Sequence, residues 1–207
     1  MFYDDIPLNK SICVLTTPRT GSTALCRMLS DKLNLIFFNE VFHPNMSQSQ
    51  IEFFWSCFQN NSNSIIKIFP NHHDRLTEDE FNQILDKSFV IFLERKDIAK
   101  QIASYHILER NKKPFYSKNE ISNPYVVDED RITDNVFFIL KIQNEAERYR
   151  KLANMSVYYE DIVDDIINDH IKEYPKPTNY DSIKSKVDDT LSKILTLQNR
   201  YQKSIEK

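Results

Sequence analysis

Five short runs of apolar and β-branched residues recur along this chain of 207 residues, and they restrict the folds open to it. They are residues 11–16 (SICVLT), 35–38 (LIFF), 64–69 (SIIKIF), 88–94 (SFVIFLE) and 155–159 (MSVYY). Nearly continuous runs of this kind are typical of strands buried on both faces of a sheet. Helical patterns lie between them, at residues 22–32, 50–59, 77–87, 98–110 and 133–152. The alternation predicts an α/β fold with a central parallel sheet flanked by helices.

The length favours a single domain, because a chain of this size buries about 70% of the surface that its unfolded form exposes. Thr77 and Glu80 have the spacing of a capping box, which predicts the start of one helix. Residues 112–130 carry two prolines among clustered Asn, Ser and Asp, and they predict a long loop that serves as a lid or binds substrate. Residues 180–205 predict an amphipathic C-terminal helix.

The mildly acidic composition disfavours nucleic acid as a partner. The net charge is -3 and the pI is about 6.0, whereas duplex-binding modules usually carry a basic stripe. The N-terminal stretch MFYDDIPLNK lacks the basic and apolar regions of a secretory signal. No apolar run approaches the roughly 20 residues of a membrane-spanning helix. We therefore expect a cytoplasmic location and no integral membrane segment.

Cysteine and histidine give no sign of a disulfide or a metal site. Cys13, Cys26 and Cys57 are odd in number, lie in apolar surroundings and lack CxxC spacing, which favours reduced, packed thiols. The adjacent histidines of NHHD (71–74) have no further ligands at a suitable spacing. We expect no metal.

Gly21 is the only glycine of the chain, and it stands in the stretch LTTPRTGSTAL (15–25), between the first strand run and a helical pattern. Amide groups at a helix start converge on one point, where the helix dipole favours an anion such as phosphate. Glycine lets the backbone approach that anion closely or adopt a positive φ. Ser22 and Thr23 add hydroxyl donors, and Arg19 adds a forked cation. The alternative is a plain turn with Ser22 as N-cap.

A magnesium-bound triphosphate is a poor guest for this loop. Nucleotide triphosphatases bind their phosphates with a loop of the pattern GxxxxGK[ST]. When this chain is aligned with that pattern, Thr16 stands at the first glycine position and Ser22 at the lysine position. The later strand run ends in Glu94 and Arg95 rather than in a magnesium-binding aspartate. A small kinase is therefore the weaker alternative.

The loop instead resembles the 5'-phosphosulfate loop of sulfotransferases that use 3'-phosphoadenosine 5'-phosphosulfate (PAPS). It is most similar to the PRSGST type of bacterial, trehalose-modifying carbohydrate sulfotransferases, from which PRTGST (18–23) differs by one threonine. The resemblance implies a P-loop-NTPase-like sulfotransferase fold. It also implies that Pro18, Arg19, Thr20, Gly21, Ser22 and Thr23 surround the 5'-phosphate and the transferring sulfuryl group.

A second motif of the same family, RxDxxxQxxS, is met by Arg95, Asp97, Gln101 and Ser104. The resemblance implies that Arg95 pairs with the 3'-phosphate of the donor and that Ser104 donates its hydroxyl to it. The alternative is that Arg95 and Asp97 form a solvated pair at a helix start. Together the two motifs span about the first half of the chain.

Glu40, in LIFFNEVFHP (35–44), follows the second strand run, at the edge of the sheet where ligands of open α/β folds gather. The trehalose-type relatives use a glutamate in this location, followed by an aromatic residue, as general base, and Glu40 followed by Phe42 fits that pattern. The alternatives are that Glu40 caps a helix or pairs with a lysine, and that His43 is the base.

Two further elements resemble parts of the family. Lys67, within an apolar run, corresponds to a lysine of the donor or acceptor pocket, although a lysine reaching out from an edge strand is an equal alternative. VYYEDIVDD (157–165) resembles a late strand-to-helix element, so Glu160 and Asp161 are expected at a helix start.

The resemblance implies an enzyme that transfers a sulfuryl group from PAPS to a hydroxyl of a carbohydrate or glycolipid and releases 3'-phosphoadenosine 5'-phosphate (PAP), without a metal. Glu40 would take the proton, and Arg19 would hold the transferring group. The alternative from another class is a non-catalytic protein that binds PAPS or PAP.

Overall fold

The computed structural model describes residues 2–7, 9–60, 63–70, 75–111, 128–170 and 177–205. The chain forms two compact units: residues 1–96 with 141–172, called the first unit, and residues 97–140 with 173–207, called the second unit. One of the three points at which the chain passes between the units lies inside the long helix α5 (Ile132–Arg150). The expectation of a single domain stays a prediction.

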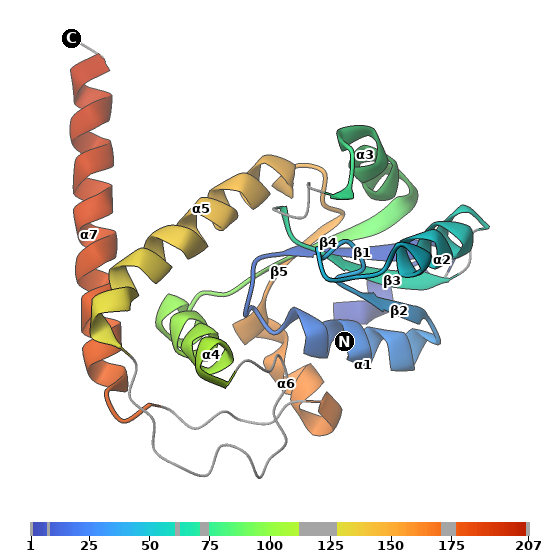
Figure 1. Ribbon diagram of the computed structural model, residues 1–207, viewed down its shortest axis with the longest axis horizontal. Helices are drawn as coiled ribbons and strands as arrows, with labels where there is room; N and C mark the ends of the chain where they lie inside the picture. The colour runs from blue at the N-terminus through green and yellow to red at the C-terminus, as the bar shows by residue number, and fades with distance from the viewer. Residues whose placement is uncertain are drawn as a thin grey trace. The chain divides into compact units, whose positions relative to one another are not determined.

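The first unit is built on a five-stranded parallel sheet in the order β2-β3-β1-β4-β5 (Figure 1). The strands are β1 (Ser11–Thr16), β2 (Ile36–Asn39), β3 (Ser64–Ile68), β4 (Ser88–Glu94) and β5 (Met155–Tyr158). This confirms the predicted α/β class with a central parallel sheet. A loop between β1 and the first helix completes a strand-loop-helix unit, and the P-loop-NTPase-like character of the fold stays a prediction.

Helices cover both faces of the sheet. On one face α1 (Ser22–Leu33) and α6 (Tyr159–His170) pack on the β1 residues Ile12 and Val14. On the other face α2 (Gln48–Gln59), α3 (Glu78–Lys87) and the end of α5 pack on Cys13 and Leu15. Successive residues of a strand point to opposite faces, so β1 contributes to both cores.

Burial on both faces is confirmed for the central strands β1, β3 and β4. It is wrong for β5, where half-buried and exposed residues alternate. It is also wrong for β2, where Phe38 is buried but Ile36 is 44% exposed. The physical reason is their position, since each of these strands forms an edge of the sheet and pairs with one neighbour only.

Local capping signals set the starts of two helices. The predicted capping box of Thr77 and Glu80 is present at α3. A second capping box, formed by Ser47 and Gln50, starts α2 two residues before the predicted position. Glu160 and Asp161 lie in the first turn of α6, as expected. Of the expected loop at 112–130, residues 112–127 lie outside the described part of the chain.

All three cysteines are free. Burial raises the pKa of the Cys13 thiol, and burial raises that of Cys26 to about 12, so both stay protonated at neutral pH and act as core residues. Within the described ranges, no helix has the length and apolar character that crossing a bilayer requires.

The second unit is helical. Its apolar core joins α4 (Ile98–Asn111), the 132–140 part of α5, and α7 (Tyr180–Ile205), which occupies the range expected for the C-terminal helix. The buried members are Ala99, Ile102, Ile132, Val136, Ile139, Ile183 and Val187. A short 3-10 helix, Glu129–Arg131, precedes α5.

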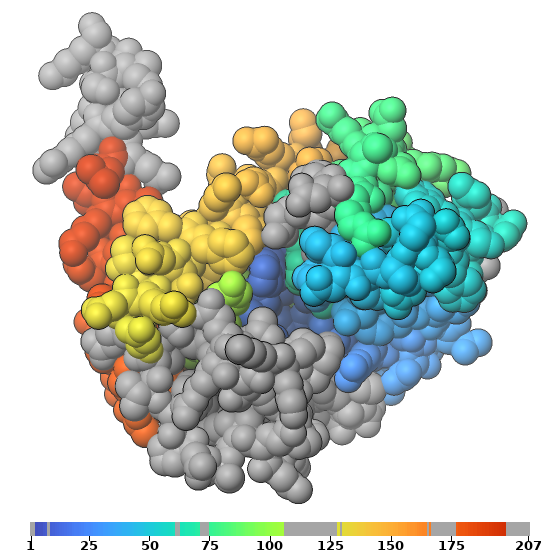
Figure 2. Space-filling view, viewed as in Figure 1, coloured from blue at the N-terminus to red at the C-terminus, as the bar shows by residue number. Residues whose placement is uncertain are grey.

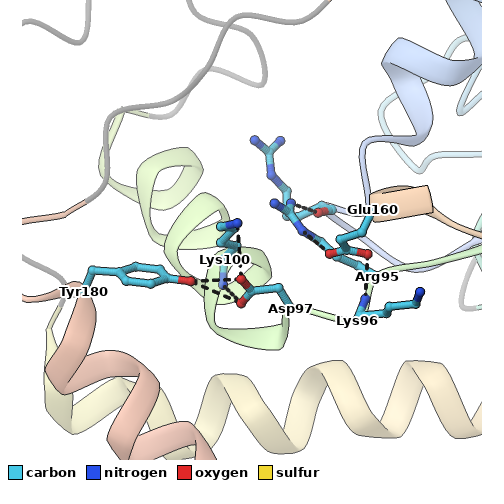
Figure 3. A network of polar contacts seen from close by, with 7 residues as sticks. Arg95, Lys96, Asp97, Lys100, Glu160 and Tyr180 are labelled. Carbon is cyan, nitrogen blue, oxygen red and sulfur yellow. Dashed lines mark hydrogen bonds and ion pairs between the residues drawn. The ribbon is translucent and has the colours of Figure 1, made fainter. Parts of the chain in front are cut away.

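Asp97 is the N-cap of α4 and also links α4 to α7. Its carboxylate accepts hydrogen bonds from the Lys100 amide at 2.9 Å and from the Tyr180 hydroxyl at 3.0 Å (Figure 3). Burial alone would raise the pKa of Asp97, but these two donors and the charge of Lys100 hold the pKa below its ordinary value. The carboxylate form therefore stabilises the second unit.

We predict that Asp97→Ala lowers the free energy of unfolding by about 1 kcal/mol at pH 7, as is typical for a lost N-cap. Because the folded-state pKa of Asp97 is lowered, its stabilisation is present at neutral pH and is lost as the pH falls through that pKa. The difference from the wild type should thus shrink below about pH 4. Urea unfolding at pH 7 and pH 3 measures it. An equal loss in the control Asp188→Ala, at an exposed position of α7, would contradict the prediction.

Candidate functional site

The strand order has a switch point beside β1. The strands β3 and β2 lie on one side of β1, and the strands β4 and β5 lie on its other side. Ligands of open α/β sheets bind at such a point, beyond the carboxyl ends of the strands. The loop of residues 17–21 follows β1, and Arg95 follows β4. Both predicted motifs of the first unit therefore begin at this edge.

Threonine hydroxyls fold the loop onto itself. The Thr16 hydroxyl donates to the Leu93 carbonyl at 2.9 Å and lies 2.6 Å from the Thr20 hydroxyl. The Thr20 hydroxyl donates to the Thr17 carbonyl at 3.0 Å. Thr20 is fully buried, so here its side chain shapes the loop, and its contact with a phosphate stays a prediction.

Gly21 has a φ of +83°, so the expected positive φ is confirmed. Arg19, two residues earlier, is also left-handed, with a φ of +65°. Such backbone turns form concave groups of amides that bind anions. Gly21 is the N-cap of α1 and has no side-chain acceptor for the amides of the first turn, so the alternative that Ser22 is the N-cap is wrong.

A second constraint on Gly21, not foreseen from the sequence, is the ring of Tyr159. A Cβ atom at position 21 would lie 2.3 Å from Cε2 of that ring and 2.4 Å from Cδ2. No side chain fits there without displacing the ring. The lone glycine is thus required both by its φ and by close packing against the residue that begins α6.

Lys67 brings a buried ammonium group to this loop. It is 2% exposed, and its Nζ atom donates to the Thr23 hydroxyl at 2.7 Å and pairs with the Glu40 carboxylate at 2.6 Å. The register between β2 and β3 sets Asn39 opposite Lys67, which brings Glu40 within reach. Of the alternatives left open for Glu40, the structure shows the ion pair with a lysine. The roles of Glu40 as base and of Lys67 in the pocket stay predictions.

The guanidinium of Arg95 lies beside the same loop. Its Nη1 donates to the Arg19 carbonyl at 3.0 Å, its Nε lies 3.7 Å from the Glu160 carboxylate, and its Cζ lies 5.1 Å from the centre of the Tyr159 ring. Glu160 also accepts from the Lys96 amide at 2.9 Å (Figure 3). The Arg95 side chain is only 14% exposed, so it is not solvated as the alternative interpretation requires.

The remaining predicted residues are placed differently. Ser104 and Gln101 are buried in the second unit, so their convergence with Arg95 on one nucleotide stays a prediction. The Nδ1 atom of His43 accepts from the Asn45 amide at 3.2 Å and thus serves the turn after β2. Its role as a base is untested.

No sequence pattern indicates the contact of Tyr159 with Gly21 or the pairing of Arg95 with Glu160. These residues lie far along the chain from the loop and meet it only because β4 and β5 are neighbours in the sheet. The late strand-to-helix resemblance marked the right segment but not its contacts.

A pocket of about 260 Å³ lies elsewhere, lined by Trp55 and Gln59 of α2 and by Glu80 and Gln83 of α3. The side chains of these two helices form neighbouring surfaces in Figure 2, coloured cyan and green. None of the lining residues belongs to the predicted site. Among the described residues there is no group of three or more His, Cys, Asp or Glu able to hold a metal, and residues 71–74 lie outside that part.

We predict that Gly21→Ala destabilises the protein by about 2 to 5 kcal/mol, because a left-handed alanine costs about 1 to 2 kcal/mol and crowding against Tyr159 adds about 1 to 3. In a Tyr159→Ala background, Gly21→Ala should cost only the about 1 to 2 kcal/mol that a left-handed alanine requires. Asn34, also left-handed with a φ of 52°, provides the matched control Asn34→Ala. Denaturant unfolding measures all four variants, and an equal cost of Gly21→Ala with and without the ring would refute the packing argument.

Comparisons with known proteins leave the family open. No protein-family model and no curated protein matches the chain. Similar solved structures include an uncharacterized protein from Eubacterium ventriosum, with 12% identity, a TM-score of 0.43, and coverage of 77% of this chain and 97% of that one. A gluconokinase from Sinorhizobium meliloti has 8% identity and a TM-score of 0.42, and the match covers 95% of this chain and 98% of that one. A shikimate kinase from Bacteroides thetaiotaomicron has 14% identity and a TM-score of 0.42, with coverage of 90% and 98% in the same order. These values assign no function, so the α/β class rests on the sheet topology itself.

Proposed function

We propose that this protein transfers a sulfuryl group from PAPS to a hydroxyl of a carbohydrate or glycolipid acceptor and releases PAP. The observation that carries the proposal is the hydrogen bond from Arg95 Nη1 to the Arg19 carbonyl. It brings the loop of residues 18–23 and Arg95, the first residue of the second motif, to the same edge of the sheet. A donor with anionic groups on both its 5' and 3' positions needs a cation beside each of them.

The charges near the loop suit such a donor. Lys67 is buried beside the first turn of α1, and Arg95 is largely buried beside Arg19. Electrostatic attraction is stronger at buried sites than in bulk water. The amides of the first turn of α1 add partial positive charge. We assign the 5'-phosphosulfate to residues 18–23 and Lys67, and the 3'-phosphate to Arg95.

The proposed reaction is a direct displacement at sulfur. The acceptor oxygen forms a bond to sulfur while the bond between sulfur and the bridging oxygen of the 5'-phosphate breaks. The hydroxyl proton passes to the Glu40 carboxylate, a contribution of the kind that is typically worth about 10² to 10⁴ in rate. The negative charge that grows on the bridging oxygen is stabilised by Arg19, Lys67 and the loop amides.

Lys67 would serve both halves of this reaction. One ammonium group contacts the Thr23 hydroxyl in the donor loop and the carboxylate of the proposed base. Base and leaving group are thereby tied to a common cation, which limits their relative displacement. A displacement of about 1 Å can cost a hundredfold in rate.

Phosphoryl transfer is the second candidate, and one observation favours it. The loop lacks the lysine of nucleotide triphosphatases, but Lys67 delivers an ammonium group to Thr23 from a neighbouring strand. Against it, the carboxylate at the end of β4, Glu94, forms an ion pair with Arg150. That carboxylate is therefore not available as a magnesium ligand in this arrangement.

We predict that Arg95→Ala weakens binding of PAP at least tenfold, because a hydrogen bond to a charged group contributes about 1.5 to 3 kcal/mol. The same substitution should weaken binding of adenosine 5'-phosphate, which lacks the 3'-phosphate, much less. Calorimetry with both nucleotides separates recognition of the 3'-phosphate from an indirect effect through the Arg19 carbonyl. Lys96→Ala, at an exposed neighbouring position, is the control. Equal losses for both nucleotides would reject the assignment of the 3'-phosphate to Arg95.

A further inference from the structure

We propose that Arg75 is a positioning residue that holds the segment carrying Glu40 in its working conformation. The proposal rests on the proposed function for what Glu40 does, but its structural part stands on contacts of the first unit alone. The segment concerned, called the Glu40 segment, comprises residues 40–47 between β2 and α2.

The Glu40 segment begins in an uncommon conformation. Glu40 has a φ of +50°, in the left-handed region that residues other than glycine seldom adopt. Such a conformation costs about 1 to 3 kcal/mol and persists only where the surroundings fix it. Something outside the residue must therefore hold it.

Several contacts fix the start of the segment. Lys67 pairs with the Glu40 carboxylate, and Val41 and Phe42 are buried in the core. The His43 amide donates to the Glu40 carbonyl at 2.8 Å, which closes a turn. These contacts reach as far as His43. Ser47 is fixed as the N-cap of α2, and the mostly exposed residues 44–46 between them need another anchor.

Arg75 supplies that anchor. Its Nη1 atom donates to the carbonyls of His43, Pro44 and Met46, at 3.5 Å and 3.3 Å for the first two and at a short distance for the third. One nitrogen with two hydrogens serves three carbonyls, so the backbone of the segment curves around a single cation. Arginine stays charged at every accessible pH, and bonds from a charged donor are the stronger kind.

Arg75 is itself held by its neighbours along the chain. Leu76 is buried in the core, and Thr77 is the N-cap of α3 with a complete capping box. The guanidinium therefore ties the Glu40 segment to a fixed helix start rather than to another loop. This contact links β2, which carries the proposed base at its end, to α3 on the face that α2 and α3 share.

The consequence for catalysis is selective. The Arg75 contacts are to residues 43–46 and do not include the donor loop of residues 18–23 or the Lys67 side chain, so loss of Arg75 should leave nucleotide affinity intact. The orientation of the Glu40 carboxylate should become less fixed, which lowers turnover rather than affinity. A residue with a general structural role would affect both.

The experiment compares Arg75→Met, which removes the donors but keeps the apolar stem, with Arg75→Lys, which keeps charge and donors. Arg148→Met, at an exposed position of α5, is the matched control, and Glu40→Gln is the reference for loss of the base. Three quantities are measured on the full chain: the Kd for PAP, the release of PAP from PAPS with water as acceptor, and hydrogen exchange of the Met46 amide, which donates to the His43 carbonyl at 2.9 Å.

We expect Arg75→Met to keep the Kd for PAP within twofold, to lower turnover at least tenfold, and to speed exchange of the Met46 amide about tenfold. Arg75→Lys should restore turnover to within about threefold of the wild type. Wild-type turnover and exchange in Arg75→Met would overturn the proposal, and so would a matching loss in Arg148→Met. Failure of Arg75→Lys to restore either quantity would also count against it.

The outcome is separable from that of the proposed function. If Glu40→Gln keeps full turnover, or the wild type neither binds PAP nor releases it from PAPS, the proposed function fails. The exchange measurement then still decides whether Arg75 holds the Glu40 segment. If Arg75→Met does not fold, exchange in Arg75→Lys decides, since unchanged protection of the Met46 amide is required there.

Discussion

The contact between Gly21 and the Tyr159 ring is the constraint on which the site depends. A glycine with a φ of +83° is the only residue that both adopts this backbone conformation and leaves room for the ring. The contact joins the loop after β1 to the start of α6, and the Arg95 guanidinium lies over the same ring. Three segments that are distant in the sequence are thus fixed to one another at the carboxyl edge of the sheet.

Two buried or largely buried cations at this edge are each paired within the protein. Lys67 faces Glu40, and Arg95 faces Glu160 and the Arg19 carbonyl. Burying an unpaired charge is costly, so these partners explain how the cations tolerate their burial. An anionic guest that shares the cations would compete with the two carboxylates. The affinity and selectivity for that anion then depend on how readily each carboxylate leaves its ion pair.

Local patterns predicted the fold better than they predicted the contacts of the site. Periodicity predicted all five strands, because central strands need apolar residues on both faces, and the Thr77 capping box is set within four residues. The same pattern failed for the edge strands, since nothing local tells whether a strand has one neighbour or two.

Gly21 marked the loop, yet the need for glycine comes partly from Tyr159, and no pattern links the two. The contacts of Arg75 and Glu160 likewise depend on which strands are neighbours. For Glu40, the sequence favoured a base by resemblance and left a helix cap or a lysine partner as alternatives, and the register of β2 and β3 sets it beside Lys67.

We propose that the edge formed by the loop around Gly21 and by Arg95 recognises an adenosine nucleotide with anionic groups on both its 5' and 3' positions. The decisive measurement is a calorimetric titration of the full chain with PAP and, separately, with ATP and magnesium. We expect PAP to bind at least tenfold more tightly than ATP with magnesium. Tighter binding of ATP with magnesium, or no binding of PAP, would contradict it.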